Sequence, residues 1–283
     1  MSDDAIAVNL SGVPETLLWP LYARAAEARR PDARLRDTKA VALLDSIDYP
    51  FEARFGRAPQ VLALRELSFD AQVRRFLLHH PRGTVVALAD GLNTQFSRLD
   101  NGQARWLSID LPEVIELRDR LLPGTDRSRN LACSALDPRW MATVEDRDGV
   151  FITAQGLLFY LQESEAYDLI LGCARAFPGA AMMFDMMPRA FTISVRGNTV
   201  QNAFFVRGKR EGGQGYRLPP MPWGASFAAV RKRLRRDPAV AAVRFARVPA
   251  GRGVVFGCAT PVMDRVPGLR SATPWHAVVE FAQ

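Results

Sequence analysis

One stretch, Thr84 to Asp110, constrains the fold of this chain more than any other. An unbroken apolar run, Val85 to Ala89, meets Asp90-Gly91 and passes into a segment that predicts a helix. A second apolar segment, Trp106 to Ile109, then ends at Asp110. Strand, glycine turn, helix, strand and acidic residue in this order form the first half of a βαβ nucleotide-binding unit.

The spacing and the glycine content of this stretch point in different directions. Asp110 follows Gly91 at close to the ~20-residue offset expected between phosphate-loop glycines and a ribose-binding carboxylate. The glycine signature is incomplete, because Ala87 and Ala89 stand where glycines could. A nucleoside ligand is therefore indicated, and the presence of a phosphate group is left open.

Length and composition bound the remaining choices. The 283 residues, 48% of them hydrophobic, can bury the core of one large α/β domain or of a domain with an appendage. No apolar run reaches the ~18 residues that cross a bilayer, and the N-terminus MSDDAIAVNL lacks the features of a signal peptide. We expect a cytoplasmic protein without a membrane partner.

The net charge of +7 raises the question of a nucleic-acid partner. Nearly all of the positive charge is arginine, and it is spread along the chain. The densest cluster, residues 231–236, lies in a short segment that predicts a helix ended by Asp237-Pro238, and a solvated helix face explains it. With no interleaved aromatic residues to stack on bases, we expect no nucleic-acid partner.

Periodicity divides the chain into two parts. Residues 1–80 predict a helical cap, with helices over 14–31 (interrupted or restarted at Pro20), 38–47 and 61–78. Residues 81–283 predict alternating strands and helices, hence a mostly parallel sheet covered on both faces. The glycine-rich and proline-rich segment at about 186–225 is too long for a simple connection and predicts a lid insertion.

Several kinds of chemistry are missing from the sequence. There is no GxSxG, HExxH, CxxC or GxxxxGK[ST] motif. His79, His80 and His276 are not spaced as metal ligands or as members of a catalytic triad, and we expect no metal. The three cysteines are widely separated, and we expect them to be buried apolar side chains.

What remains is a ligand site at the carboxyl ends of parallel strands. The segments that follow the predicted strands are, in chain order, Ala89–Asn93, Asp110-Leu111, Ser134–Asp137 and Gln155-Gly156. Each segment has a simpler explanation, such as a turn glycine at 91 or a helix cap at Asp110. The ordered set of four favours the ligand site.

The motifs in order resemble a known family. ETLLWPLYARA, LRELSFDAQVRRFL, VVALADGLNTQFSRLD, SIDLPEVIELRDRLLP, ACSALDPRW and AQGLLFYLQ, over roughly residues 14–185, resemble the leucine carboxyl methyltransferase family. The likeness is greatest to its bacterial branch of polyketide-type O-methyltransferases. The resemblance implies a class I methyltransferase (Rossmann-like) fold with S-adenosylmethionine as methyl donor and S-adenosylhomocysteine as product. It also implies a small-molecule carboxylate or phenol as acceptor, and we leave open assembly into a homodimer.

The resemblance also implies roles for individual residues. Arg65 would pair with the donor's carboxylate, which suits a planar bidentate guanidinium. Asp110 would accept both ribose hydroxyls. The other donor contacts would be Ala89, Asp90, Gly91, Leu111, Ser134, Ala135, Asp137 and Gln155. No catalytic group is certain; Gln155 and Tyr160 are positioning candidates, and Tyr22, Tyr160 and Arg189 are candidate contacts of the acceptor.

The chain departs from the family pattern at Ala89, Asn93, Gln95 and Gln155, where glycine, aspartate, arginine and glutamate are usual. Ser134 stands where many methyltransferases carry an acid. Alanine at 89 is tolerable if its φ stays negative, and Gln155 keeps hydrogen bonding but loses a charge. We expect a variant active site; the alternative is a relative that has become a ligand-binding or interaction module.

Overall fold

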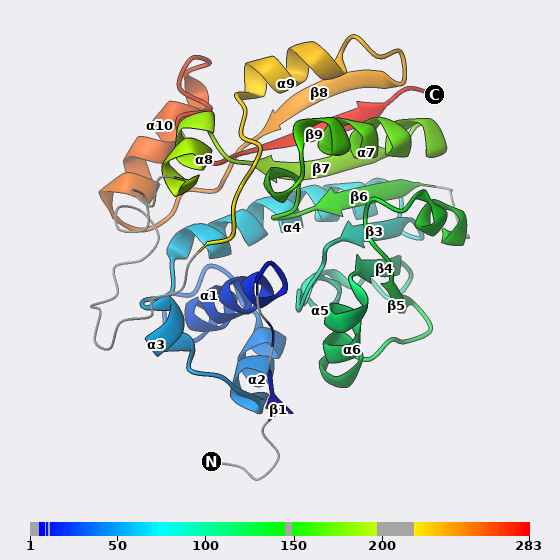
Figure 1. The fold of residues 1–283 in the computed structure, drawn as a ribbon. Coiled ribbons are helices and arrows are strands. Elements are labelled where there is room, and N and C mark those ends of the chain that lie inside the picture. The colour runs from blue at the N-terminus through cyan, green and yellow to red at the C-terminus, as the bar shows by residue number, and fades with distance from the viewer. Residues whose placement is uncertain (1–5, 9, 11, 145–148, 197–217) are drawn as a thin grey trace.

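The computed structural model describes residues 6–8, 10, 12–144, 149–196 and 218–283. A seven-stranded sheet crosses the molecule, with helices on both faces (Figure 1). Its strands, in spatial order, are β5 (Ser128–Ala132), β4 (Arg105–Asp110), β3 (Thr84–Leu88), β6 (Val150–Ala154), β7 (Ala181–Met186), β9 (Trp275–Phe281) and β8 (Val240–Ala246). Strand β9 runs opposite to the other six strands of this sheet, which are parallel to one another. The expected α/β fold with a mostly parallel sheet is confirmed.

Most of the helices match segments predicted as helical, but those at residues 51–55 and 189–196 were not predicted. The helices are α1 (Leu18–Ala28), α2 (Thr38–Ser46), α3 (Phe51–Phe55), α4 (Gln60–His79), α5 (Gln95–Leu99), α6 (Pro112–Leu121), α7 (Glu163–Ala176), α8 (Arg189–Arg196), α9 (Phe227–Leu234) and α10 (Thr260–Arg265). Short 3₁₀ turns cover η1 (Pro14–Leu17), η2 (Pro138–Thr143) and η3 (Leu158–Tyr160), and a π turn, η4 (Val255–Ala259), precedes α10. Two short parallel strands, β1 (Ile6–Ala7) and β2 (Ile47–Asp48), pair beside the N-terminal helices.

Pro20 neither interrupts nor restarts the first helix. It occupies the third position of α1, where a backbone N–H has no acceptor within the helix, so its missing donor costs nothing there. The 3₁₀ turn η1 leads directly into α1. Among the described helices, none is long and apolar enough to cross a membrane.

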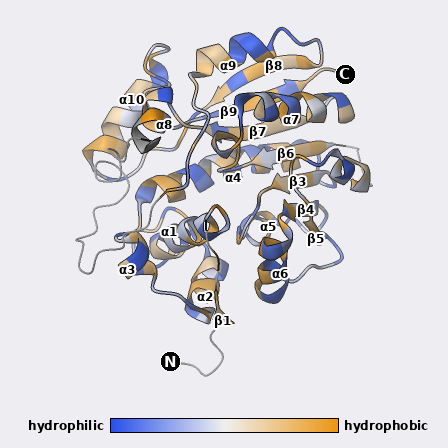
Figure 2. Cartoon of the chain, viewed as in Figure 1, coloured by the Kyte–Doolittle hydropathy of each residue, from blue (hydrophilic) through white to orange (hydrophobic). Residues whose placement is uncertain are grey.

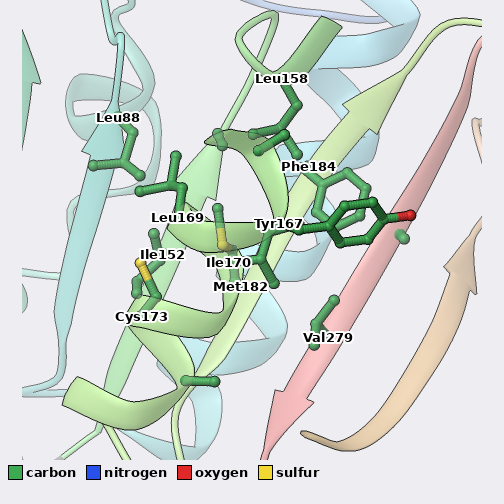
Figure 3. Packing of buried hydrophobic residues seen from close by; sticks show 14 of the residues in the cluster. Leu88, Ile152, Leu158, Tyr167, Leu169, Ile170, Cys173, Met182, Phe184 and Val279 are labelled. Atoms are coloured by element: carbon green, nitrogen blue, oxygen red, sulfur yellow. The ribbon is translucent and has the colours of Figure 1, made fainter. Parts of the chain in front are cut away.

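Both faces of the sheet are buried, as its strand sequences require. Along β7, Met182 and Phe184 face one core and Met183 faces the other. The first core lies under α7 and α9, and Figure 3 shows Leu169, Ile170 and Cys173 of α7 lying over β3, β6 and β7. In Figure 2 the strands are largely in hydrophobic colours, whereas the surface helices carry both colours. Two-sided burial explains why these strands read as continuous apolar runs.

The second core changes how the N-terminal part is understood. Phe69, Val73 and Leu77 of α4 pack on Val85 and Phe151 of the sheet. Helix α4 therefore covers the sheet although it lies within the segment predicted as the cap, whereas α1, α2 and α3 form a separate apolar cluster. A domain division at residue 80 stays a prediction.

Two further expectations meet the structure only in part. Most of the predicted lid lies outside the described residues, at 197–217; of its described ends, Met187, Met221 and Trp223 are buried in the core. Among the cysteines, Cys173 is buried as expected and Cys133 is half-buried. Cys258 is exposed, so the expectation of burial was wrong for it.

A buried network of charged side chains joins the N-terminal helices to the sheet. Arg98 of α5 contacts Asp37 at 2.6 Å, Asp70 at 3.0 Å and, in addition, Glu66. Asp37 caps the start of α2 through the backbone N–H of Ala40 at 2.9 Å, and Glu66 and Asp70 lie on α4. All three carboxylates are at most 1% exposed. Because an unpaired buried charge is costly, these helices are held in one arrangement.

Replacing Arg98 by methionine keeps an unbranched apolar stem and removes the charge. We expect Arg98→Met to lower the free energy of unfolding by about 3–5 kcal/mol, because it leaves three buried carboxylates without their main partner. Urea unfolding would measure this. Arg244→Met is the control, since the Arg244–Glu280 pair is about 40% exposed (42% and 41%) and its loss should cost less than about 1 kcal/mol. Equal losses in the two variants would contradict the importance of the network.

The turn after β3 is strained. Ala89 has a φ of +51°, the only positive φ recorded for a described residue other than glycine. The expectation that alanine is tolerated here with a negative φ was therefore wrong. The left-handed conformation costs an L-residue about 1–2 kcal/mol because its Cβ crowds the backbone. Gly91 shares this conformation, and a Cβ built on it would lie 3.0 Å from Leu17 Cβ, so glycine is required there on two grounds.

Ala89→Gly should relieve this strain. We expect a gain in unfolding free energy of about 0.5–1 kcal/mol after allowing for the greater freedom of glycine in the unfolded chain. The control is Ala87→Gly in the middle of β3, where no strain exists and glycine should destabilise the protein. Thermal unfolding of both variants would check the opposite signs; a destabilised Ala89→Gly protein would show that the turn stores no strain.

Candidate functional site

A cleft lies at the carboxyl ends of β3, β4 and β6. From β3 the strand order runs to β4 and β5 on one side and to β6 and β7 on the other, so the chain connections leave this edge of the sheet in opposite directions (Figure 1). This switch point is where ligands bind in open parallel sheets. The cleft has a volume of about 970 Å³, its open mouth included. Residues 13–20, at the start of the N-terminal helices, line one side, and Leu62 and Arg65 of α4 line another.

Most of the predicted donor-binding residues line this cleft together. They are Arg65, Ala89, Asp90, Gly91, Asp110, Leu111 and Gln155, and Tyr160 joins them from η3. The adjacent strand ends bring these segments together, although the residues are up to 95 positions apart in the sequence (65 to 160). The βαβ interpretation of Thr84–Asp110 thus brought these residues to one cleft, and their binding of a ligand stays a prediction.

Two buried arginines hold the turn between Ala89 and Asn93 by its carbonyl groups. Arg118 donates from Nη1 to the Gly91 oxygen at 2.7 Å and to the Asn93 oxygen at 3.1 Å. Arg24 donates from Nη2 to the Leu92 oxygen at 2.7 Å. The conformation of the turn is therefore set by side chains beneath it, which compensates for its few glycines.

Asp90 has a structural role in this arrangement. Its carboxylate lies 3.0 Å from Arg118 Nη2 and accepts a hydrogen bond from Ser108 Oγ at 2.6 Å. Burial raises the pKa of Asp90, although Arg118 and Ser108 oppose the shift. The Asp90 side chain is thus buried and occupied by Arg118 and Ser108, so Asp90 lines the cleft mainly through its backbone.

Asp110 is the carboxylate best placed for a ligand. It accepts hydrogen bonds from the backbone N–H groups of Gly91 at 2.7 Å and Leu111 at 2.8 Å. Burial raises its pKa to about 6, against the lowering effect of these two bonds. Because the Gly91 N–H is used in this way, it is not free to cradle a phosphate. The turn is therefore suited to a nucleoside without a pyrophosphate.

Arg65 and Gly156 also line the cleft, and both contact the buried Asp185. Arg65 Nη1 lies 3.2 Å from Asp185 Oδ2, and the Gly156 N–H donates to Asp185 Oδ1 at 2.6 Å. Gly156 has a φ of +75°, and a Cβ there would approach Arg65 Nη1 to 3.1 Å. Arg65 Nε is buried and has no acceptor among the described residues, so this donor is available to an anionic ligand group.

Gln155 and Tyr160 line the cleft, and each has a polar atom that can form a further hydrogen bond. Gln155 donates from Nε2 to Glu66 Oε2 at 2.7 Å, while its Oε1 is buried without a donor in the described part of the chain. Burial raises the pKa of Tyr160 above its usual range, with a smaller contribution from Asp185, so its phenol stays protonated and can donate a hydrogen bond.

Five predicted residues do not line the cleft. Ser134, Ala135 and Asp137 follow β5 beside it; Asp137 pairs with Arg139, which lowers its pKa to about 2. Tyr22 stacks on Phe51 of α3, with ring centroids 5.7 Å apart, and Arg189 is exposed at the start of α8. Their predicted roles in binding stay predictions.

Sequence reasoning missed Arg24 and Glu66. The helical spacing of Leu17, Leu21 and Arg24 put the arginine on a buried face, and Glu66 falls between Leu62 and Phe69 in the same way. A charged residue on an apolar helix face is the signal that could have identified both. Their partners come from other elements and were not predictable from the helices alone.

Comparison with known proteins assigns the chain to a family, although no protein-family model matches it. It is 37% identical over 182 residues to the tetracenomycin polyketide synthesis O-methyltransferase of Streptomyces glaucescens, which covers 63% of this chain and 67% of that protein. It is 29% identical over 181 residues to an S-adenosyl-L-methionine-dependent methyltransferase of Gibberella zeae, covering 58% of this chain and 61% of that protein, or less than two thirds of it.

Solved structures agree with the fold. A possible exported protein of Bordetella parapertussis superposes with a TM-score of 0.52 at 13% identity, covering 96% of this chain and 97% of that one. A DUF574 family protein of Streptomyces avermitilis gives 0.50 at 13% identity, covering 92% and 96%. The class I methyltransferase fold is confirmed by the sheet order and its flanking helices. The chain therefore belongs to the family of S-adenosylmethionine-dependent O-methyltransferases that includes the tetracenomycin enzyme.

Proposed function

We propose that this protein transfers the methyl group of S-adenosylmethionine to an oxygen of a small-molecule carboxylate in polyketide-type secondary metabolism. The observation that carries the proposal is one cleft lined by the Asp110 carboxylate, by Arg65 with an unpaired Nε and by Gln155 with an unpaired Oε1, and with no free general base among its described lining residues. A carboxylate acceptor also agrees with the resemblance of the ordered motifs to the leucine carboxyl methyltransferase family.

The unsatisfied polar atoms of the cleft fit this donor. Asp110 keeps lone pairs for the two ribose hydroxyls after accepting two backbone hydrogen bonds. Arg65 Nε can donate to the donor's carboxylate, and Gln155 Oε1 can accept from its ammonium group. A buried donor and a buried acceptor without partners are uncommon, and a ligand with both an acid and an amine satisfies both.

Bound in this cleft, the donor would supply a methyl group activated by a positively charged sulfur. The chain's own contribution is to position the acceptor and to exclude water. Positioning alone can account for much of the acceleration when the reacting atoms are held in line. Trp19, Leu62 and Phe159 give the cleft apolar walls beside its polar atoms, and Tyr160 can donate a hydrogen bond to an acceptor oxygen.

The choice between carboxylate and phenol depends on proton removal. Among the described residues that line the cleft, Asp90 is engaged by Arg118 and Ser108, Asp110 is assigned to the ribose hydroxyls, and burial keeps Tyr160 protonated, so none of the three is left as a base. His276 lies on β9, where burial lowers its pKa to about 4, and its Nδ1 is 2.9 Å from Ser68 Oγ. An acceptor that is ionised before it binds needs no base, and near pH 7 this describes a carboxylate.

The pH dependence of turnover tests the acceptor class. Methyl transfer from radiolabelled donor is measured with a panel of aromatic acids and their matched phenols, at saturating donor. We expect transfer to acids, with a rate that is flat from about pH 7 to 9. Transfer confined to phenols, with a rate rising toward pH 10, would replace the carboxylate by a phenol. Transfer to neither, together with no donor binding, would refute the proposed function.

Asp110 predicts a pH dependence of donor binding. Ribose hydroxyls donate to the charged carboxylate, so affinity should be constant above about pH 7 and fall as the pH drops through about 6, approaching tenfold per unit. Asp110→Asn should weaken binding of S-adenosylhomocysteine about 10- to 100-fold and abolish this pH dependence.

Calorimetric titration of S-adenosylhomocysteine between pH 5 and 8 measures both effects. Asp100→Asn is the control, because Asp100 pairs with Arg127 away from the cleft and should leave affinity unchanged. If Asp110→Asn binds S-adenosylhomocysteine as the wild type does, Asp110 does not bind the ribose and another group must. The same material, in sedimentation experiments, would test the homodimer, which stays a prediction.

A further inference from the structure

The amide of Gln155 has a fixed orientation. Its Nε2 donates to Glu66 Oε2 at 2.7 Å, and an ionised carboxylate can only accept. The NH₂ group must therefore face Glu66, and the amide oxygen faces away from it. That oxygen is buried and has no donor among the residues described, in a side chain that lines the cleft.

Glu66 is held in its ionised form. It is fully buried, and burial alone would raise its pKa, but Arg98 and Arg24 outweigh this effect and bring the pKa to about 2. The surrounding network holds the carboxylates of Asp37, Glu66 and Asp70 and the guanidinium groups of Arg24 and Arg98, and Arg65 also acts on Glu66. Glu66 therefore contacts the Gln155 amide as an ionised acceptor whose own position is fixed by arginines.

The same turn of α4 contributes to the contacts of both charged groups at the amino-acid end of the ligand. Arg65 and Glu66 are neighbours in sequence, and Arg65 offers its unpaired Nε to the cleft that Gln155 also lines. A buried donor and a buried acceptor on one cleft wall complement an amino acid with its carboxylate and its ammonium group. The usual glutamate of the family is absent at 155, and Glu66 places a negative charge one layer further back.

We propose that Glu66 is a positioning residue for the donor's amino group: it orients Gln155 so that Oε1 accepts a hydrogen bond from that ammonium. The inference rests on the proposed function and deepens it. It distinguishes an amide contact backed by a buried carboxylate from a direct ion pair.

The test compares ligands with and without the amino group. S-adenosylhomocysteine, its des-amino analogue and 5′-methylthioadenosine are titrated calorimetrically into the wild type, Gln155→Met and Glu66→Gln, with folding checked by thermal unfolding. Gln155→Met keeps the side-chain volume close and removes both polar atoms. Gln95→Met is the matched control, because Gln95 donates to buried Asp70 at 2.9 Å in the same manner but does not line the cleft.

We expect Gln155→Met to bind S-adenosylhomocysteine about 10- to 100-fold more weakly, with 5′-methylthioadenosine unchanged within about twofold. The des-amino analogue should bind the wild type more weakly by a similar factor and should not distinguish the wild type from Gln155→Met. Glu66→Gln should also weaken S-adenosylhomocysteine relative to 5′-methylthioadenosine, because the Gln155 amide is then free to turn. Gln95→Met should leave this ratio at its wild-type value.

Several results would overturn the inference. One is equal weakening of S-adenosylhomocysteine and 5′-methylthioadenosine in Gln155→Met; another is equal binding of the des-amino analogue and S-adenosylhomocysteine by the wild type, which decides the question even if the variants do not fold. If the wild type binds S-adenosylhomocysteine and 5′-methylthioadenosine but does not distinguish S-adenosylhomocysteine from its des-amino analogue, the proposed function stands and only this inference is lost. A wild type that binds none of the ligands loses both.

Discussion

Arg98 contacts three buried carboxylates at once, and much of the molecule is arranged around that contact. Asp37 caps α2, Glu66 and Asp70 lie on α4, and Arg98 itself lies on α5 just after the turn that forms the cleft. Taking these charges out of water is expensive, and their mutual attraction offsets the cost only if geometry and hydrogen bonds are kept. The network therefore fixes the N-terminal helices against the sheet and fixes Glu66 behind the ligand site.

The same principle governs the turn after β3. A dinucleotide site is shaped by glycines whose N–H groups face a pyrophosphate. Here Arg118 and Arg24 hold the carbonyl groups of the turn, and the Gly91 N–H donates to Asp110. Arginine side chains, in place of glycines, thus set the backbone conformation of the turn, and Ala89 adopts the strained positive φ. A nucleoside that lacks a pyrophosphate suits this arrangement, which explains why an incomplete glycine signature still belongs to a binding site.

Sequence patterns located β3, β6 and β7 most clearly because both faces of these strands are buried, which makes their apolar runs continuous, whereas β5 and β8 keep exposed positions. The same patterns located Asp110 and Gln155, since strand ends on one edge of a parallel sheet must lie together. They were less informative about Ser134, Ala135 and Asp137, which follow a strand one position further out and lie beside the cleft. They also did not separate α4 from the cap, because helical periodicity shows that a face is buried but not which surface covers it.

The sequence by itself determined the order of the main strands and helices and the acidic residue after the second strand, and its motifs indicated the O-methyltransferases that include the tetracenomycin enzyme. These depend on local periodicity and on motifs read along the chain. Only the tertiary structure decided that Ala89 is left-handed, that Asp90 is committed to Arg118, and that Gln155 is oriented by Glu66. Each of these depends on the direction of a side chain toward a partner far away in sequence, and the energy of a buried charge depends on that partner more than on the residue itself.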